Sequence, residues 1–191
     1  MKKILLSATA VSVLILAACN NNAHKEAAAA PSAPVAALVD SKADAGFTTS
    51  WKAVVDQYLA LKNGLAADDD VVAAKAGEAM YQALVTIKTD ALAADQQKIY
   101  KDNEDDLKEH AEHIGKNAGN IGHQREHFEQ MSADMLALVK AFGAGQTLYQ
   151  DHCPMYNNNK GGSWLSETEA IKNPYMGSKM SDCGSVQTVF K

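Results

Sequence analysis

Residues 121–142, with the sequence IGHQREHFEQMSADMLALVKAF, carry the pattern that decides the fold. Apolar side chains recur at helical spacing along this stretch, at Ile121, Phe128, Met131, Met135, Leu138 and Phe142. That spacing puts them on one face of an α-helix, and Gly143 and Gly145 predict where the helix ends. Because an apolar face has to be buried, the stretch predicts a helix packed against others.

Three stretches upstream show the same spacing, over about residues 46–65, 68–87 and 94–114. Three aspartates at 68–70 favour a helix start, because the N-terminus of a helix carries a partial positive charge. Four helices of this length, joined by short connections, are typical of an up-down-up-down bundle. We therefore expect a mainly α fold built on a four-helix bundle.

The helical spacing is lost over about residues 146–191. Two runs rich in β-branched and aromatic residues predict short strands there, Thr147–Tyr149 and Ser185–Phe190. If these strands pair, they form a small β-hairpin and loop cap at the C-terminus. The same pairing would bring Cys153 near Cys183.

The N-terminus has the organisation of a lipoprotein signal peptide over residues 1–18. Lys2 and Lys3 precede an apolar run that is too short to span a bilayer as a helix. The run ends in Leu-Ala-Ala-Cys, a lipobox that predicts cleavage before Cys19 and lipidation of its sulfur. The alternative is an ordinary signal peptide that happens to precede a cysteine.

Lipid chains on Cys19 would anchor the chain to a membrane surface without crossing it. The next residue is Asn20, not the aspartate that favours retention in the inner membrane. We therefore expect a lipoprotein on the periplasmic face of the outer membrane. Residues 19–45, rich in Ala, Asn, Pro and Ser, predict a flexible tether to one domain over residues 46–191.

Charge and motif content exclude several classes of function. Without the signal peptide, the chain holds 16 basic and 23 acidic side chains, a formal charge of −7. Nucleic-acid binding needs a basic surface, so we expect no nucleic-acid partner. The chain has no P-loop, nucleophile elbow or dinucleotide motif, so we expect neither an enzyme nor a small-molecule substrate.

Sulfur-bearing side chains gather between residues 153 and 183. Thiolate and thioether sulfur are the ligands that soft ions such as Cu(I) and Ag(I) prefer. The predicted ligands, with the last two as additional candidates, are Cys153, Met155, Met180, Cys183, His152 and Met176. The alternative is a disulfide between the two cysteines, which an oxidising compartment favours, with the methionines packed as apolar filler.

Four histidines flank the turn between the last two predicted helices. His110 and His113 are three residues apart, and His123 and His127 are four apart. In an antiparallel helix pair both couples lie at one end of the bundle, where their imidazoles can chelate Zn(II) or Cu(II). The alternatives are solvated side chains beside a polar turn and, for His110, a hydrogen-bonded core residue. A site combined with the sulfur set would need His152 to reach the same end.

The chain resembles a bacterial domain family over roughly residues 47–189. The matching residues are Gln124-Arg125-Glu126-His127-Phe128, Ser132, Tyr149, Cys153-Pro154-Met155, Trp164-Leu165-Ser166, Ile171, Asn173-Pro174-Tyr175, Gly177, Met180 and Cys183-Gly184. Members of this family occur as lipoproteins or periplasmic proteins, and also fused to the C-terminus of periplasmic adaptors of heavy-metal RND efflux pumps. Relatives often carry an aromatic residue at the position of Met176.

The resemblance implies copper or silver handling, with an RND efflux adaptor as partner. Our first reading is a lipid-anchored module that binds Cu(I) or Ag(I) and buffers the ion or hands it to an efflux system. The second reading is an envelope interaction protein without metal, in which a Cys153–Cys183 disulfide staples the cap. A third is a Zn(II) or Cu(II) site built from the four histidines.

Overall fold

The computed structural model describes residues 34–36 and 45–191. The predicted signal peptide, the lipidation site Cys19 and most of the tether lie outside the described residues. Within the described part of the chain, no helix is long and apolar enough to cross a membrane.

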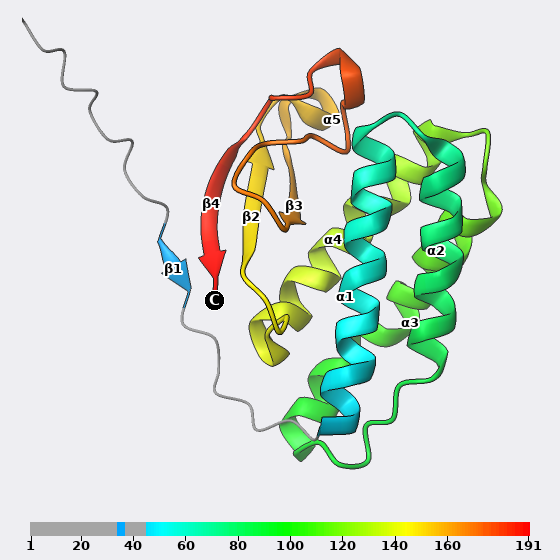
Figure 1. Ribbon diagram of the computed structural model, residues 1–191, viewed down its shortest axis with the longest axis vertical. Helices are drawn as coiled ribbons and strands as arrows, with labels where there is room; N and C mark the ends of the chain where they lie inside the picture. The colour runs from blue at the N-terminus through cyan, green and yellow to red at the C-terminus, as the bar shows by residue number, and fades with distance from the viewer. Residues whose placement is uncertain (1–33, 37–44) are drawn as a thin grey trace, which may run out of the picture. The chain divides into compact units, whose positions relative to one another are not determined.

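Four helices form the bundle that the sequence predicts (Figure 1). They are α1 (Ala45–Ala66), α2 (Asp70–Val85), α3 (Ala94–Lys116) and α4 (Ile121–Phe142). Each helix packs against the next one along the chain, so neighbouring helices run in opposite directions. The predicted mainly α fold with an up-down bundle is confirmed.

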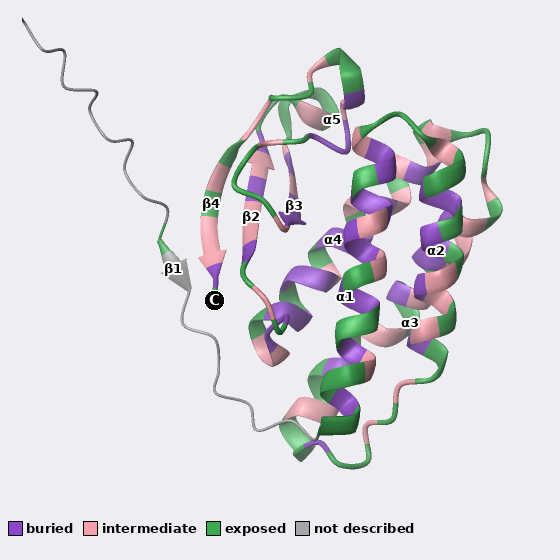
Figure 2. Cartoon of the chain, viewed as in Figure 1, coloured by how far each residue is buried: buried purple, intermediate pink, exposed green. Residues whose placement is uncertain are grey.

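The inner faces of the helices carry the apolar core, coloured purple in Figure 2. Val54, Leu107 and Phe128, on α1, α3 and α4, are fully buried. Burying a side chain of this size contributes about 1.5–3 kcal/mol. A glycine lets α2 approach α3 closely, because a Cβ at Gly77 would lie 3.0 Å from the carbonyl oxygen of Ala111.

Side-chain caps fix the starts of two helices. Asp69 accepts a hydrogen bond from the backbone N–H of Val72 at 2.9 Å, where α2 begins. Asn120 accepts one from the backbone N–H of His123 at 3.3 Å, where α4 begins. Both caps satisfy N–H groups that have no partner within the helix. The second cap sets the first turn of the helix that carries His123 and His127.

The C-terminal cap is a small sheet beside the bundle. Strand β2 (Leu148–Cys153) pairs antiparallel with both β4 (Ser185–Phe190) and β3 (Gly162–Ser166). The two-residue strand β1 (Val35–Ala36) adds in parallel to the outer edge of β4. The predicted pairing of the two terminal strands is confirmed, and β2 runs beyond its predicted end at Tyr149.

Strand β3, which the sequence did not predict, anchors the sheet to α4 and α1. Its neighbouring residues Trp164 and Leu165 are both fully buried, which breaks the alternation that signals a strand. The backbone N–H of Leu165 donates to the hydroxyl of Tyr58 at 3.1 Å. That hydroxyl also pairs with the Ser132 hydroxyl of α4 at 2.8 Å, so the cap and the bundle share one buried network.

Arg125 of α4 ties the cap loop to one end of the bundle. Its Nε donates to the carbonyl of Pro174 at 2.7 Å. Its Nη2 donates to the carbonyl of Leu65 at 2.8 Å and to the carboxylate of Asp68 at 2.6 Å. The other oxygen of Asp68 accepts from the backbone N–H of Ser178 at 2.8 Å. The α1–α2 turn, α4 and the cap loop therefore meet at one clamp.

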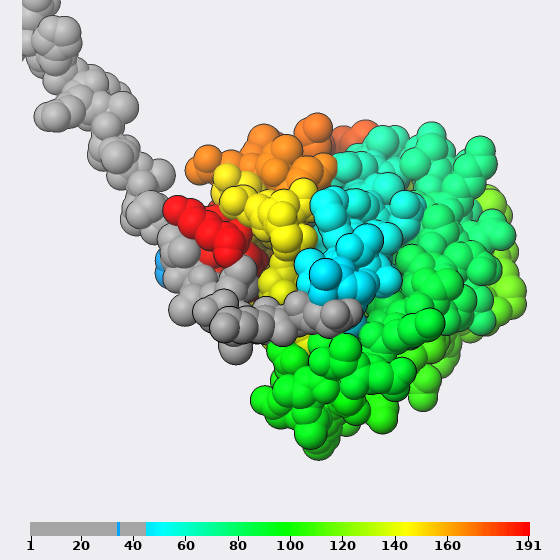
Figure 3. All heavy atoms as spheres, turned by 60° about the horizontal axis from the view of Figure 1, so that its bottom comes forward, coloured from blue at the N-terminus to red at the C-terminus, as the bar shows by residue number. Residues whose placement is uncertain are grey.

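Aromatic side chains close the opposite end of the bundle. The Phe47 ring lies 4.9 Å from that of Phe142 and 6.2 Å from that of Tyr100, between centroids. The indole N–H of Trp51 donates to the carbonyl of Gly143 at 2.7 Å. Figure 3 brings this end forward and shows α1 (cyan) between the α2–α3 part of the chain (green) and the segment after α4 (yellow).

Candidate metal centre

Helices α3 and α4 bring histidines together at the end of the bundle that carries their connecting turn. His123 and His127 are one turn apart on α4, and His113 faces them from α3. One ligand nitrogen from each of the three lies within 4.8 Å of the other two. Among the residues that the structure describes, these three histidines form the one group of His, Cys, Asp or Glu side chains that is placed to share an ion.

Ring contacts make His127 the centre of the group. The rings of His113 and His127 are stacked with centroids 4.4 Å apart, and the His123 ring meets His127 edge-on at 4.5 Å. His110, nearly one turn before His113 on α3, places its Nδ1 3.0 Å from Nδ1 of His127. His127 therefore contacts each of the other three imidazoles.

The surroundings keep two of these imidazoles neutral. Burial lowers the pKa of His110, and burial together with the neighbouring His113 and His123 lowers the pKa of His127. The carboxylate of Glu109 acts in the opposite direction on both without outweighing burial. A neutral imidazole is the form that binds a metal ion, so both rings are in their ligating form at neutral pH.

The geometry suits a first-row divalent ion after a small adjustment. Zn(II) binds imidazole nitrogen at about 2.0–2.1 Å, which sets ligand atoms about 3.3 Å apart in a tetrahedron. Side-chain rotation would have to close the present spacing, which is within 4.8 Å, to that value. All three side chains are half-buried, so solvent reaches the group. Three protein ligands leave a fourth position for water or for another ligand.

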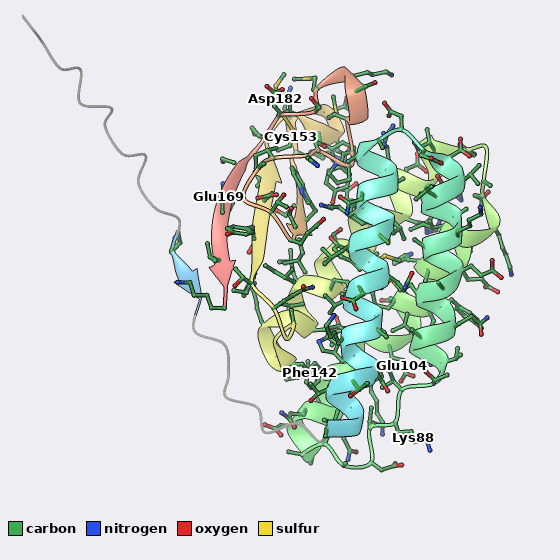
Figure 4. The ribbon with its side chains drawn as sticks, in the orientation of Figure 1. Lys88, Glu104, Phe142, Cys153, Glu169 and Asp182 are labelled. Carbon is green, nitrogen blue, oxygen red and sulfur yellow. A yellow bond between two sulfur atoms is a disulfide. The ribbon has the colours of Figure 1, made fainter. Side chains whose placement is uncertain are left out.

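The sulfur set is arranged differently, because Cys153 and Cys183 form a disulfide. The bond joins the end of β2 to the loop before β4, where Figure 4 labels Cys153 and Asp182. A disulfide offers no thiolate, which is the form that binds metal. The predicted Cu(I) or Ag(I) site therefore needs the reduced chain and stays a prediction. The disulfide proposed as its alternative is present in the structure.

Of the other predicted ligands of the sulfur set, the three methionines lie between the two cysteines along the chain, and His152 directly precedes the first cysteine. Met155 follows β2 and is 51% exposed. Met176 and Met180 flank a single 3-10 turn of the cap loop and are partly buried. His152 of β2 bonds through Nδ1 to the hydroxyl of Ser163 at 3.0 Å. Because His152 is not among the converging histidines, the structure does not form the combined site considered above.

A buried polar cluster between cap and bundle was not predicted from the sequence. Lys62 of α1 is fully buried, with its Nζ 2.8 Å from a carboxylate oxygen of Glu167. Asp151 of β2 is also fully buried, and its carboxylate lies beside the indole N–H of Trp164. Burial raises the pKa of Asp151 to about 7, although the charge of Lys62 acts in the opposite direction.

The irregular burial along β2 explains why sequence pattern missed Asp151. In a regular strand side chains alternate, so an inward Leu148 would place Gln150 inward and Asp151 outward. In the structure Asp151 is buried together with Leu148 and Cys153. The pairing with β4 shifts beside it, because Gln150 faces Thr188 and Asp151 faces Val186, which leaves Gln187 of β4 as the extra residue of a bulge. No signal in the sequence marks this bulge.

Residues 54–147 match the model of a family described as a protein of unknown function, DUF3347. The match covers just under half of the chain and supports a relation to a domain family of unknown function. It runs from within α1 to the residue before β2, so it includes all four histidines. It ends before residues 153–183, the sulfur-bearing loop. Most of the residues on which the resemblance to a bacterial domain family rests lie in that loop. Comparison with curated proteins and with solved structures found no match.

Proposed function

We propose that the folded domain is a metal-binding module with a histidine centre formed by His113, His123 and His127. The observation that carries the proposal is the convergence of three ligand nitrogens within 4.8 Å at a half-buried place. Imidazole suits Zn(II) and Cu(II), whereas Ca(II) and Mg(II) take oxygen ligands. The ion of this proposal is therefore Zn(II) or Cu(II).

The role that we propose is to buffer the ion or to pass it on. Three protein ligands leave a coordination position that a ligand from a second protein can enter, and half-burial gives that ligand access. The lipobox at Cys19 supports a lipid anchor on the periplasmic face of the outer membrane. The resemblance to domains fused to RND efflux adaptors supports such an adaptor as the receiver.

A second candidate is a Cu(I) or Ag(I) site at the sulfur residues of the reduced chain. The observation that favours it is the closeness of Cys153 and Cys183, whose Cα atoms are 5.5 Å apart. Two-electron reduction would free two thiolates there, with Met155 and Met180 as further soft ligands. A thiol count on chain purified without reductant tests this candidate. Two reactive thiols that Ag(I) protects would support it, and a quantitative disulfide that metal leaves unchanged would remove it.

A Zn(II) titration of the full-length chain in detergent, against a chromophoric chelator, tests the histidine centre. We expect one ion per chain and an affinity at least about 100-fold weaker in His127→Ala, because losing a residue that only supports a ligand already costs 10–100-fold. His152→Ala is the matched control, since this histidine is also partly buried and lies outside the group. Equal affinity in all three proteins would overturn the proposal.

A further inference from the structure

Both histidines of α4 have one ring nitrogen engaged by a neighbour. Nδ1 of His127 lies 3.0 Å from Nδ1 of His110, and Nδ1 of His123 lies 3.4 Å from Oε2 of Glu126. An imidazole has two nitrogens, and one that is held in a hydrogen bond cannot bind an ion at the same time. The nitrogen left for a metal ion is therefore Nε2 in both rings.

His110 differs from the other three histidines in its burial. It is 8% exposed, whereas the three converging side chains are half-buried. It also lies outside the group whose ligand atoms come together. Ala111 and Ile114, which follow it on α3, are buried as well. His110 thus offers a fixed hydrogen-bond partner at the inner side of the histidine centre.

Metal binding would select one tautomer for each member of the His110–His127 pair. The nitrogen that binds the ion carries no proton, so His127 bound through Nε2 keeps its proton on Nδ1. That Nδ1–H donates to Nδ1 of His110, which then accepts and holds its own proton on Nε2. The pair satisfies the Nδ1 atoms of both rings without adding a charge to the buried side.

We propose that His110 is a positioning residue for the metal centre and not a fourth ligand. It accepts the Nδ1 proton of His127 and so aims Nε2 of that ring at the ion. Glu126 orients His123 in the same way. This inference rests on the proposed histidine centre, because it assigns the partners that hold two of its ligands. Partners of this kind fix the ring and make the ligating nitrogen more basic.

The two partners should contribute unequally. His110 is buried and its contact with His127 is 3.0 Å long, so water does not compete for it. Glu126 is exposed in 73% of its side chain, and its contact with His123 is 3.4 Å long. Loss of the first should weaken Zn(II) binding by 10–100-fold. Loss of the second should cost less than about threefold, because exposed ion pairs contribute little.

Three variants of the full-length chain separate positioning from ligation. His110→Leu removes the acceptor and keeps an apolar side chain in a buried place. His110→Asn is its matched partner, because the amide oxygen of asparagine takes the place of Nδ1 and still accepts a hydrogen bond. Glu126→Gln tests the exposed partner. We expect Zn(II) affinity to fall 10–100-fold in His110→Leu, and to stay within about threefold of wild type in the other two.

Spectroscopy supplies readouts that a merely structural role would not move. Pulsed EPR of the Cu(II)-loaded chain should count three coordinated imidazoles in wild type and in His110→Asn. Nitrogen-15 NMR of the wild type should show His127 protonated on Nδ1 after Zn(II) is added. The NMR measurement needs no variant, so it decides the proposal even if His110→Leu fails to fold.

The outcomes separate this inference from the function on which it rests. A wild-type chain that does not bind Zn(II), or that binds it equally well as His127→Ala, overturns both. If His127→Ala abolishes binding but His110→Leu binds like wild type, the centre stands and the positioning role falls. One imidazole fewer in His110→Asn than in wild type would make His110 a ligand, and would overturn the proposal.

Discussion

The histidine centre and the sulfur-bearing loop are two candidate metal sites on one chain, built in different ways. The histidines come from two packed helices whose spacing sets their approach, and their half-buried ligand nitrogens stay accessible. The cysteines are brought together by strand pairing across a separation of 30 residues, and a disulfide consumes both sulfurs. Ligands on packed helices remain available to an ion, whereas two cysteines that lie close together can form a disulfide that stabilises the fold.

Removing the disulfide should have the largest effect on stability. It tests the claim that the two cysteines stabilise the fold. A cross-link that closes a loop of this length contributes about 3–4 kcal/mol through the entropy of the unfolded chain. We expect Cys153→Ser with Cys183→Ser to lower the free energy of unfolding by that amount in urea titrations. Zn(II) affinity should stay within about threefold, because neither cysteine lies in the histidine group. Parallel loss of Zn(II) binding would show that the two regions act as one site.

The next effect is a pH dependence that belongs to the cap. Burial raises the pKa of Asp151 from 3.8 to about 7, so the folded chain holds this proton more tightly than the unfolded chain. The stability that this proton provides is complete below about pH 4 and is lost as pH rises through about 7. The loss should amount to roughly 2–4 kcal/mol. Asp151→Asn removes the ionisable group at this position. It should therefore reduce the dependence of the unfolding free energy on pH in urea titrations from pH 4 to 8.

Asp134→Asn is the matched control for that slope. The pKa of Asp134 is raised to about 6, first by burial and then by Asp106, so its slope has the same sign and ends near pH 6. The Asp134 variant should keep the loss of stability between pH 6 and 7 that the Asp151 variant lacks. An Asp151→Asn chain that is less stable than wild type at pH 8 would contradict the assignment, because it would mean that the carboxylate is stabilising.

A smaller effect should follow from opening the Arg125 clamp between the two regions. Arg125→Met removes three hydrogen bonds, to Pro174, Leu65 and Asp68, and we expect a loss of about 1–3 kcal/mol in unfolding free energy. Asp68→Asn is the milder comparison, because asparagine tolerates the positive φ of 57° at this position and still accepts from Ser178. If both variants matched wild type in thermal and urea unfolding, the clamp would contribute nothing to the free energy of unfolding.

The smallest effect should come from the cap of α4. Asn120→Ala leaves the N–H of His123 without its side-chain partner and should cost about 1 kcal/mol. Because this turn carries His123, we also expect a loss of Zn(II) affinity of less than about fivefold, measured by the same chelator competition. Asn120→Asp keeps an acceptor and should match wild type in both measurements. A full loss of affinity in Asn120→Ala alone would mean that the first turn controls the centre.

The helical half of the molecule follows from local pattern. The four helices begin and end close to the predicted positions, because caps and apolar spacing are short-range signals. The meeting of His110 and His113 with His123 and His127 follows too, since spacings of three and four on two adjacent helices leave few arrangements.

The cap half depends on contacts that no short pattern reveals. Two adjacent buried residues, Trp164 and Leu165, break the alternation that would reveal strand β3, and Asp151 of β2 is buried although the alternation from Leu148 predicts that it faces outward. The burial of Lys62 beside Glu167 needs two segments 105 residues apart. The strand pairing that joins Cys153 to Cys183 was predictable, but sequence alone left both a disulfide and a metal site open.

X-ray absorption at the zinc edge of the full-length chain, loaded with one Zn(II), tests the central claim most directly. The account predicts a first shell of nitrogen and oxygen at about 2.0–2.1 Å, with the multiple-scattering signature of three imidazoles. Sulfur scatterers at about 2.3 Å would contradict it and would move the metal site to the cysteines of the cap.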